Sequence, residues 1–253
     1  MLLFATLTLV NFKTLGTFRS FEIVRINHST MTKKALVVVD LQEDFLPPSG
    51  SLAIANGRSV VEPIIKLISD PYVKQWSLVI ATQDWHPSNH TSFASQHGVE
   101  PFTELDFEHP ESGRVKKQFV WPIHCVQGST GAELESKFSK AFGEIDGVPT
   151  ANVKKGYLQD REYYSCFQDT WGLHHTEMKQ VLLDNAIDEV VFVGLAFDYC
   201  VLNSAIDSAK SFKTYVVKSL SKSVSPENDS KTEQLYKDAG VIVVDDISDI
   251  IQS

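Results

Sequence analysis

Positive charge, cysteine and long apolar runs are all scarce in this sequence. Lysine and arginine number 23 against 32 aspartates and glutamates, which gives a formal net charge of −9 at pH 7. Nucleic-acid binding requires clustered basic side chains that neutralise phosphates, so we expect no nucleic-acid partner. The apolar stretch at residues 1–10 is shorter than the roughly 20 residues of a membrane-spanning helix, so we expect no membrane partner.

Cysteine occurs at only 3 positions, Cys125, Cys166 and Cys200. An odd and sparse count argues against a disulfide framework. It fits a reducing compartment, in which thiols stay free for chemistry or pack in a core. With 253 residues, 43% hydrophobic content and no internal repeat or low-complexity linker, the chain can bury one good core.

Residues 1–31 differ from the rest of the chain, because they begin apolar and continue basic, with Glu22 as the single acid. They lack the early charge and clear cleavage site of a secretory signal, whereas a mitochondrial presequence is also basic and poor in acids. We favour a third interpretation, in which the leader at 1–31 is not part of the working protein, because an ordinary start would stand at Met31. Residues 32–253 are then expected to form a single domain. The protein is then expected in the cytoplasm, with the nucleus or peroxisome also open, and in mitochondria if the leader is a presequence.

From residue 35 onward, patterns of buried strands alternate with helical patterns. The run 35–39 is continuously apolar, as in a strand that is covered on both faces. Further strands are expected at 77–81, 150–154, 189–193, 214–218 and 241–244, and helices at 57–69, 133–142, 174–185, 199–211 and 231–239. This alternation predicts an α/β fold, with a mainly parallel central sheet and helices on both faces. Residues 91–128 are expected to be a long irregular loop, and such loops are usually functional.

Reactive side chains recur where the predicted strands end. Asp40, Asp84, Lys155 and Cys200 each stand at or shortly after such an end, and His86 follows Asp84 closely. The carboxyl ends of parallel strands share one edge of the sheet, where ligands bind in this class of fold. We therefore expect these side chains to converge on one site.

Cys200 is the candidate nucleophile. It follows a strand and a short turn and stands at the beginning of a predicted helix. A helix N-terminus stabilises a thiolate, and its free N–H groups can stabilise an oxyanion. The simpler alternative is a buried apolar side chain, which is the commoner fate of a free cysteine.

Asp40 and Lys155 are candidates to assist this thiol. A carboxylate at the position of Asp40 can act as a base, and the alternative is a turn residue. Lys155 can stabilise a thiolate, whereas its neighbour Lys154 points to the opposite face of the strand. The alternative for either lysine is a surface side chain with a packed stem.

Asp84, His86 and His124 together offer a carboxylate and two imidazoles, a set that leaves coordination positions open in a catalytic metal site. Because a single residue separates Asp84 from His86, both can reach a common centre from one extended segment. The alternative is a group of unrelated polar loop residues. Spacing does not distinguish His124 from the nearby histidines, which are His90, His97 and His109.

Taken together, these segments resemble the nicotinamidases of the isochorismatase-like hydrolase superfamily, and the fungal enzymes most closely. The resemblance extends over residues 34–246 and is carried by VVVDLQEDF at 37–45, DWHPS at 84–88, WPIHC at 121–125, KG at 155–156, DREYYS at 160–165 and GLAFDYCV at 194–201. Each segment is weak alone, but in this order and spacing the set is specific. Residues 1–31 have no counterpart in the family, and residues 98–118 match a variable insertion.

The resemblance implies a role for each matching residue. Asp40, Lys155 and Cys200 match the catalytic triad. The N–H groups of Ala196 and Cys200 match the oxyanion hole, with a cis peptide before Ala196. Asp84, His86 and His124 match the family's metal ligands. The wall that binds the substrate ring is matched by Phe45, Trp121, Tyr164, Leu195 and Tyr199.

The implied activity is hydrolysis of nicotinamide to nicotinate and ammonia through a thioester on Cys200, as part of NAD salvage. Asp40 would take the thiol proton and later give it to the leaving ammonia. A bound metal would orient the pyridine ring. Zn²⁺ is the first expectation, although two histidines and one aspartate also suit Fe²⁺ or Mn²⁺.

Two alternative functions remain at this point. One keeps the fold and triad but acts on another small carboxamide, such as a pyrazinamide-like or carbamoyl compound; superfamily members without a pyridine substrate generally lack the metal set. The other is a non-enzymatic binding protein. Dinucleotide binding is poorly supported, because Asp40-Leu41-Gln42 stands where a glycine-rich phosphate loop would follow the first strand. A homo-oligomer stays open.

Overall fold

The centre of the fold is a sheet whose strands all run in the same direction. A computed structural model describes residues 32–251. Its 6-stranded sheet has the order β5-β2-β1-β6-β7-β8, and every pairing in it is parallel. The strands are β1 (Lys34–Val39), β2 (Leu78–Asp84), β5 (Thr150–Lys155), β6 (Glu189–Leu195), β7 (Lys213–Lys222) and β8 (Ile242–Val244). The predicted parallel α/β architecture is confirmed.

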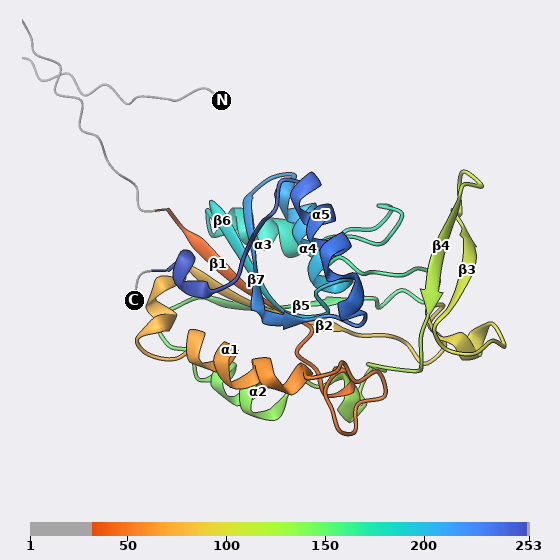
Figure 1. The fold of residues 1–253 in the computed structure, drawn as a ribbon, viewed down its shortest axis with the longest axis horizontal. Helices are drawn as coiled ribbons and strands as arrows, with labels where there is room; N and C mark the ends of the chain where they lie inside the picture. Colours follow the sequence, from red (N-terminus) through yellow and green to blue (C-terminus); the bar gives the residue numbers. More distant parts are fainter. Residues whose placement is uncertain (1–31, 252–253) are drawn as a thin grey trace, which may run out of the picture. The chain divides into compact units, whose positions relative to one another are not determined.

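Helices cover both faces of this sheet (Figure 1). One face carries α1 (Val61–Leu67) and α2 (Ser136–Gly143), and the other carries α3 (Met178–Asp184), α4 (Cys200–Ala209) and α5 (Asp229–Asp238). Successive side chains of β1 alternate between the two layers. Leu36 and Val38 pack into the core on the α1 side, and Ala35 and Val37 into the core on the α4 side.

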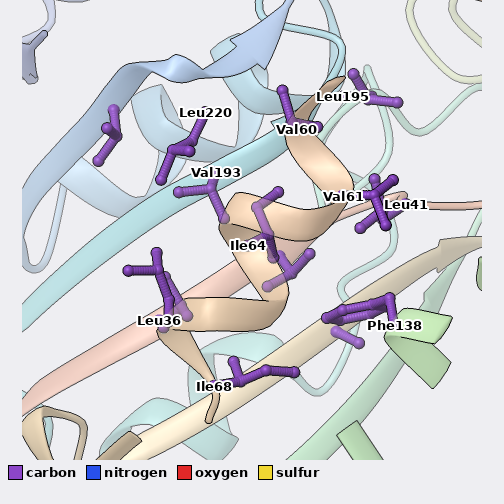
Figure 2. Packing of buried hydrophobic residues seen from close by; sticks show 14 of the residues in the cluster. Leu36, Leu41, Val60, Val61, Ile64, Ile68, Phe138, Val193, Leu195 and Leu220 are labelled. Carbon is purple, nitrogen blue, oxygen red and sulfur yellow. The ribbon is translucent and has the colours of Figure 1, made fainter. Parts of the chain in front are cut away.

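Helix α1 shows how an apolar stripe produces this packing. Val61, Ile64 and Ile68 recur at helical spacing and are buried over Leu36 and Val193 of the sheet (Figure 2). Full burial of an aliphatic side chain of this size contributes roughly 1.5–3 kcal/mol. The stripe therefore anchors the chain that leads from β1 to β2.

Helices α1, α2 and α3 each begin three or four residues later than the sequence predicts, and the cause is visible for α1 and α3. The first α-helical residue of α1 is Val61, after a 3-10 turn at Gly57–Val60, and Pro63 has no N–H with which to extend the α-helical ladder backward. Helix α3 begins at Met178 instead of residue 174. Thr176 donates its hydroxyl to the carbonyl of Cys166 at 2.5 Å, which ties the preceding residues to another segment.

The segment 91–128 is not irregular throughout, contrary to prediction. It contains an antiparallel hairpin of β3 (Thr103–Glu108) and β4 (Val115–Val120), set apart from the main sheet. In β3 the side chains alternate only between half-buried and exposed, so neither face joins a core. The sequence of β3 does alternate, with Leu105 and Phe107 set between acidic residues, but this signal is confined to one short strand and the prediction of an irregular loop overlooked it.

Within residues 32–251, no helix is both long and apolar enough to cross a membrane. The predicted leader at 1–31 lies outside the described residues. The assignment of 32–253 as a single domain stays a prediction.

Candidate active site

Four strands deliver the predicted reactive residues to one edge of the sheet. Asp40 follows β1, Asp84 ends β2 and Lys155 ends β5, with Asp84 and Lys155 as direct register partners. Cys200 is the first residue of α4, after the turn that leaves β6. Since these strands are parallel neighbours, their carboxyl ends open on the same place.

Lys155 is the centre of the buried polar cluster. Its ammonium lies 2.9 Å from Asp40 Oδ2, 2.5 Å from Asp84 Oδ1 and 3.4 Å from Cys200 Sγ, and it donates to the carbonyl of Tyr163 at 3.0 Å. The whole Lys155 side chain is inaccessible to solvent. The structure thus brings together Asp40, Lys155 and Cys200, as the sequence predicts.

Lys154 occupies a different environment, as strand alternation requires. Its ammonium lies 3.5 Å from the centroid of the Trp85 ring, in a cation–π contact. The two adjacent lysines therefore separate into a buried lysine of the cluster and a lysine held over an aromatic ring.

The backbone and side chain of Asp40 are both constrained. Its φ of 45° lies in the left-handed region, and such strained residues cluster at functional sites. Thr82 donates its hydroxyl to Asp40 Oδ1 at 2.5 Å and accepts from the Asp40 N–H at 3.1 Å. Asp40 Oδ2 has no directed hydrogen bond within residues 32–251 and faces Lys155 as an ion pair, so it is available as a proton acceptor.

Burial sets the protonation of this cluster. It raises the pKa of both the Asp40 carboxyl and the Cys200 thiol, although Lys155 opposes both shifts. Burial also disfavours a charged ammonium, but Asp40 and Asp84 raise the pKa of Lys155 well above its usual range. The raised pKa values favour a protonated Cys200 thiol and a more basic Asp40 carboxylate in the same cluster.

Asp84, His86 and His124 form a group with the donor set of a metal site. One ligand atom from each lies within 4.8 Å of the other two, and all three residues are buried. His86 Nδ1 faces the carbonyl of Gly156 at 2.9 Å, and His124 Nδ1 faces that of Pro122 at 2.8 Å. A carbonyl only accepts, so each Nδ1 carries the proton and each Nε2 presents a lone pair.

The unsatisfied atom of this group is the test of whether a cation fits. His86 Nε2 is buried, has no hydrogen-bond partner in the described part of the chain, and lies 3.6 Å from Asp84 Oδ2. A buried imidazole nitrogen without a partner is costly unless something ligates it. Burial opposes ionisation of Asp84, but the neighbouring Lys155 ammonium holds the pKa of that carboxyl well below its usual range. The residues therefore fit a divalent cation.

Gly156 is required beside His86 for two reasons. Its φ of +68° is left-handed, and a Cβ at this position would stand 2.4 Å from Cε1 of the His86 ring. Only glycine allows the strand end to approach the imidazole this closely.

The alternative histidines are occupied elsewhere. His90 is buried and stacked on His86, but one of its nitrogens faces the Ser92 hydroxyl and the other the carbonyl of Arg161. His97 bonds the carbonyl of Thr91, and His109 accepts N–H groups within the hairpin loop. None of these belongs to the group of Asp84, His86 and His124.

A pocket lies beside the Cys200 thiol at this edge of the sheet. It is lined by Phe45, Leu52, Ile54, Asp84, Trp121, His124, Glu162, Tyr164, Ala196, Tyr199, Cys200 and Val224. Four predicted ring-binding residues are present: Phe45, Trp121, Tyr164 and Tyr199. Trp121 meets the edge of Tyr199 at a centroid distance of 4.9 Å and donates its indole N–H to the Tyr164 hydroxyl at 3.3 Å.

The pocket wall differs from the prediction in two ways: Leu195 does not line it, and several residues that were not predicted do. The Leu195 side chain is fully buried in the core on the α1 side, because it is the last inward-facing residue of β6. Sequence reasoning missed four lining residues, which are Leu52, Ile54, Glu162 and Val224. Glu162 stands in a segment that carried the family resemblance, but isolated apolar residues in loops such as Leu52 give no pattern.

The turn between β6 and α4 places backbone N–H groups beside the thiol. Ala196 lines the pocket, and the Leu195–Ala196 peptide is cis, as the resemblance implies. The Cys200 N–H belongs to the first helical residue, so it has no acceptor within the helix. Ala196 and Cys200 therefore both border the pocket, and the Cys200 N–H is free of the helix's own hydrogen bonds.

Comparison with protein families identifies this arrangement. The model of the isochorismatase domain matches residues 34–247. This chain belongs to the isochorismatase family. The match includes all of the residues that make up the cluster, the metal-ligand group and the pocket.

Several of the curated proteins that this chain is similar to are nicotinamidases. The nicotinamidase of Saccharomyces cerevisiae is 38% identical over 221 residues, which cover 84% of this chain and 99% of the yeast protein. The nicotinamidase of Escherichia coli is 40% identical over 189 residues, which cover 74% of this chain and 82% of the bacterial protein.

Solved structures of this family have the same fold. The yeast nicotinamidase superposes with a TM-score of 0.79 at 36% identity, covering 84% of this chain and all of the yeast chain, and it was also solved with the inhibitor nicotinaldehyde. The pyrazinamidase of Pyrococcus horikoshii, solved in complex with zinc, superposes with a TM-score of 0.63 at 29% identity, over 84% of this chain and 98% of that chain.

Proposed function

We propose that this protein hydrolyses nicotinamide to nicotinate and ammonia in NAD salvage, through a thioester on Cys200. The observation on which this rests is the position of Cys200, which contacts Lys155 beside Asp40 and opens on an aromatic pocket next to a metal-ligand group. The names of the yeast and bacterial relatives support the same substrate.

In the first half of the reaction, Asp40 takes the thiol proton and the Cys200 sulfur attacks the carboxamide carbon. The carbonyl π electrons move to oxygen, and the N–H groups of Ala196 and Cys200 hydrogen-bond to that oxyanion. Lys155 stabilises the anionic thiolate from 3.4 Å. Asp40 then donates its proton to the amide nitrogen, so that the C–N bond breaks and ammonia leaves.

In the second half, a water molecule hydrolyses the thioester. Asp40, again a carboxylate, accepts a proton from that water while its oxygen attacks the acyl carbon. The oxyanion occupies the same hole, the C–S bond breaks and the sulfur leaves as a thiolate. The proton held by Asp40 returns to the sulfur, and the product leaves as nicotinic acid, which loses its proton to solvent and becomes nicotinate.

Asp84, His86 and His124 would hold a divalent metal, with Zn²⁺ as the first choice and Fe²⁺ or Mn²⁺ as alternatives. When bound, the metal supplies a Lewis acid for the pyridine nitrogen and so orients the ring. The zinc in the pyrazinamidase of Pyrococcus horikoshii supports this choice. The protein's own residues supply the remaining orientation, because Phe45, Trp121, Tyr164 and Tyr199 line the pocket with aromatic surface.

A second substrate is worth testing, because one curated relative from Mycobacterium tuberculosis is a nicotinamidase/pyrazinamidase at 26% identity. Pyrazinamide has the same carboxamide on a similar ring, so the pocket would admit it. The reaction would be unchanged, and only the ring that meets the metal-ligand group would differ.

Ammonia release is the direct test of the proposed function. Wild-type protein, Cys200→Ala and His86→Ala are assayed with nicotinamide and pyrazinamide, together with metal analysis of each preparation. We expect activity on nicotinamide, a loss of at least about 10³-fold in kcat for Cys200→Ala, and loss of both metal and activity for His86→Ala. Full activity of Cys200→Ala would refute the mechanism, and wild-type activity confined to another amide would change the substrate.

A further inference from the structure

The turn from Leu195 to Cys200 is held by residues outside the reacting group. Ala196 and Cys200 supply the proposed oxyanion hole, and the two residues between them that matter here are Phe197 and Asp198. This inference rests on the proposed function, because it concerns how that hole is kept in place. An oxyanion hole acts through donors that are aligned before the reaction, so whatever fixes the turn affects the rate.

Phe197, directly after Ala196, is held at both of its backbone polar groups. Its N–H donates to the carbonyl of Lys222 in β7 at 2.9 Å. Its carbonyl accepts the hydroxyl of Tyr236 in α5 at 2.6 Å. Tyr236 is fully buried, and its ring packs on that of Phe197 at a centroid distance of 5.0 Å.

In this environment the Tyr236 hydroxyl acts as a hydrogen-bond donor to the carbonyl of Phe197. Burial raises the pKa of Tyr236 well above its usual range, so the phenol stays protonated. Helix α5 comes after β7 in the chain and contributes no residue to the pocket lining. A helix distant in sequence therefore reaches the turn through one hydroxyl.

Asp198 connects the same turn to another part of the pocket lining. Its two carboxylate oxygens accept the N–H groups of Val224 at 2.9 Å and Ser225 at 2.8 Å. Val224 lines the pocket, as does Ala196. One partly buried carboxylate therefore sets the position of the turn relative to a residue that meets the substrate.

We propose that Tyr236 and Asp198 are positioning residues, which hold the oxyanion turn in the geometry that the tetrahedral intermediate requires. Neither touches the reacting atoms. Their removal should weaken stabilisation of the intermediate more than binding of the planar substrate or product, because the turn meets the developing oxyanion most closely.

The experiment compares a tetrahedral mimic with a planar ligand in Tyr236→Phe, which removes only the hydroxyl. Nicotinaldehyde is the mimic: the Cys200 sulfur bonds to its carbonyl carbon, the C=O π bond opens to an alkoxide, and the thiol proton moves to Asp40. We expect kcat for nicotinamide to fall about tenfold, with KM changed by no more than about twofold. Complete removal of one oxyanion donor lowers kcat by about 10²–10³-fold, and Tyr236→Phe should displace the donor only in part. The Ki of nicotinaldehyde should rise by a similar factor and that of nicotinate should not.

Asp198 supplies a further pair of variants, which keeps the test decisive if Tyr236→Phe does not fold. Asp198→Ala should reproduce the loss in kcat and in nicotinaldehyde affinity. Asp198→Asn keeps one acceptor oxygen, so it should restore part of both. A purely structural role would instead lower thermal stability equally in both variants and leave the ratio of the two Ki values unchanged.

Thr214→Val is the matched control. The Thr214 hydroxyl is buried, donates to the carbonyl of Phe212 at 3.1 Å and pairs with the Ser208 hydroxyl at 2.8 Å, but it lies at the other end of β7. This variant should lose stability while keeping kcat and both Ki values. The proposal would be overturned if folded Tyr236→Phe kept the wild-type kcat and nicotinaldehyde Ki. It would also be overturned if the Ki values of nicotinaldehyde and nicotinate rose by the same factor. Wild type without activity on nicotinamide would refute the proposed function alone, because nicotinaldehyde binding would still decide this inference.

Discussion

Asp40 shows at the scale of a single residue how the fold prepares a base. Its left-handed backbone turns the chain away from β1, and Thr82 binds one carboxylate oxygen so that the other faces Lys155. The pKa of this carboxyl is raised chiefly by burial, which makes it a stronger base than an exposed aspartate. Both features support the proposed role of Asp40 as the base that takes the Cys200 proton.

Asp40→Asn should abolish most of the activity without unfolding the protein. Asparagine keeps the size and can keep the contact with Thr82, but it cannot take a proton, so kcat/KM should fall by about 10²–10⁴. Alkylation of Cys200 by iodoacetamide should slow in parallel. Asp160→Asn, which changes an exposed acid paired with Arg161, is the control and should keep wild-type values. Activity of Asp40→Asn within a few-fold of wild type would show that another group is the base.

Gly156→Ala tests the metal-ligand group through its closest backbone neighbour. The added methyl would meet the His86 ring at 2.4 Å, so His86 must move and both metal content and kcat should fall. Gly147→Ala is a close control, since Gly147 has φ +74° and a Cβ there would have nothing within 4 Å. Both variants share the backbone strain of about 1–2 kcal/mol. Metal analysis should separate them, and equal metal content in both would contradict the interpretation.

At the scale of elements, the residues that pack the core and the residues of the proposed site lie in different places. The core between the sheet and α1 is built of apolar side chains, whereas the polar cluster lies beyond the carboxyl ends of the strands. The hairpin of β3 and β4 belongs to neither place. It contributes no strand to the main sheet, yet Phe102 and Phe119 pack around Trp121, which lines the pocket.

Ile64→Ala should lower stability and spare the chemistry. Ile64 is fully buried between α1 and the sheet, so truncation should lower the free energy of unfolding by about 2–5 kcal/mol. The kcat of the folded fraction should stay near wild type. Leu183→Ala on α3, where the side chain is 51% exposed, should change stability by no more than about 0.5 kcal/mol. Denaturant titration measures both, and similar losses would mean that α1 is not packed as described.

At the scale of the whole molecule, the question is how much of the chain the activity needs. The isochorismatase match begins at residue 34, and the yeast relative aligns over 99% of its own length with 84% of this chain. We propose that residues 32–253 form one catalytic domain and that the leader at 1–31 is not required for the reaction.

Removal of residues 1–31 should therefore leave kcat, KM and the melting temperature unchanged. The cut spares Lys33 and Lys34, whose bonds to Asp188 and Ile250 attach the start of β1 to the rest of the fold. Activity and thermal unfolding of residues 32–253 are compared with those of the full chain. A lower kcat or melting temperature would assign a structural role to the leader.

Much of the fold and site was predictable because it depends on local patterns. The apolar run of β1 and the stripe of α1 repeat at the periods of a strand and a helix, and those periods require no knowledge of neighbours. Asp40, Asp84, Lys155 and Cys200 were found because they end such elements. The hairpin was missed because the alternation of Leu105 and Phe107 with acidic residues in β3 is short and β4 carries no matching alternation.

The sequence by itself determined the order of elements, the shared strand edge and, through motif resemblance, the residue set to examine. Only the tertiary structure decided among similar side chains. It separated His124 from His90, placed Leu195 in the core instead of the pocket wall, and brought Val224 and Glu162 to the lining. The physical reason is that periodicity specifies an element, whereas the direction and partners of one side chain depend on residues far away in the chain that pack against it.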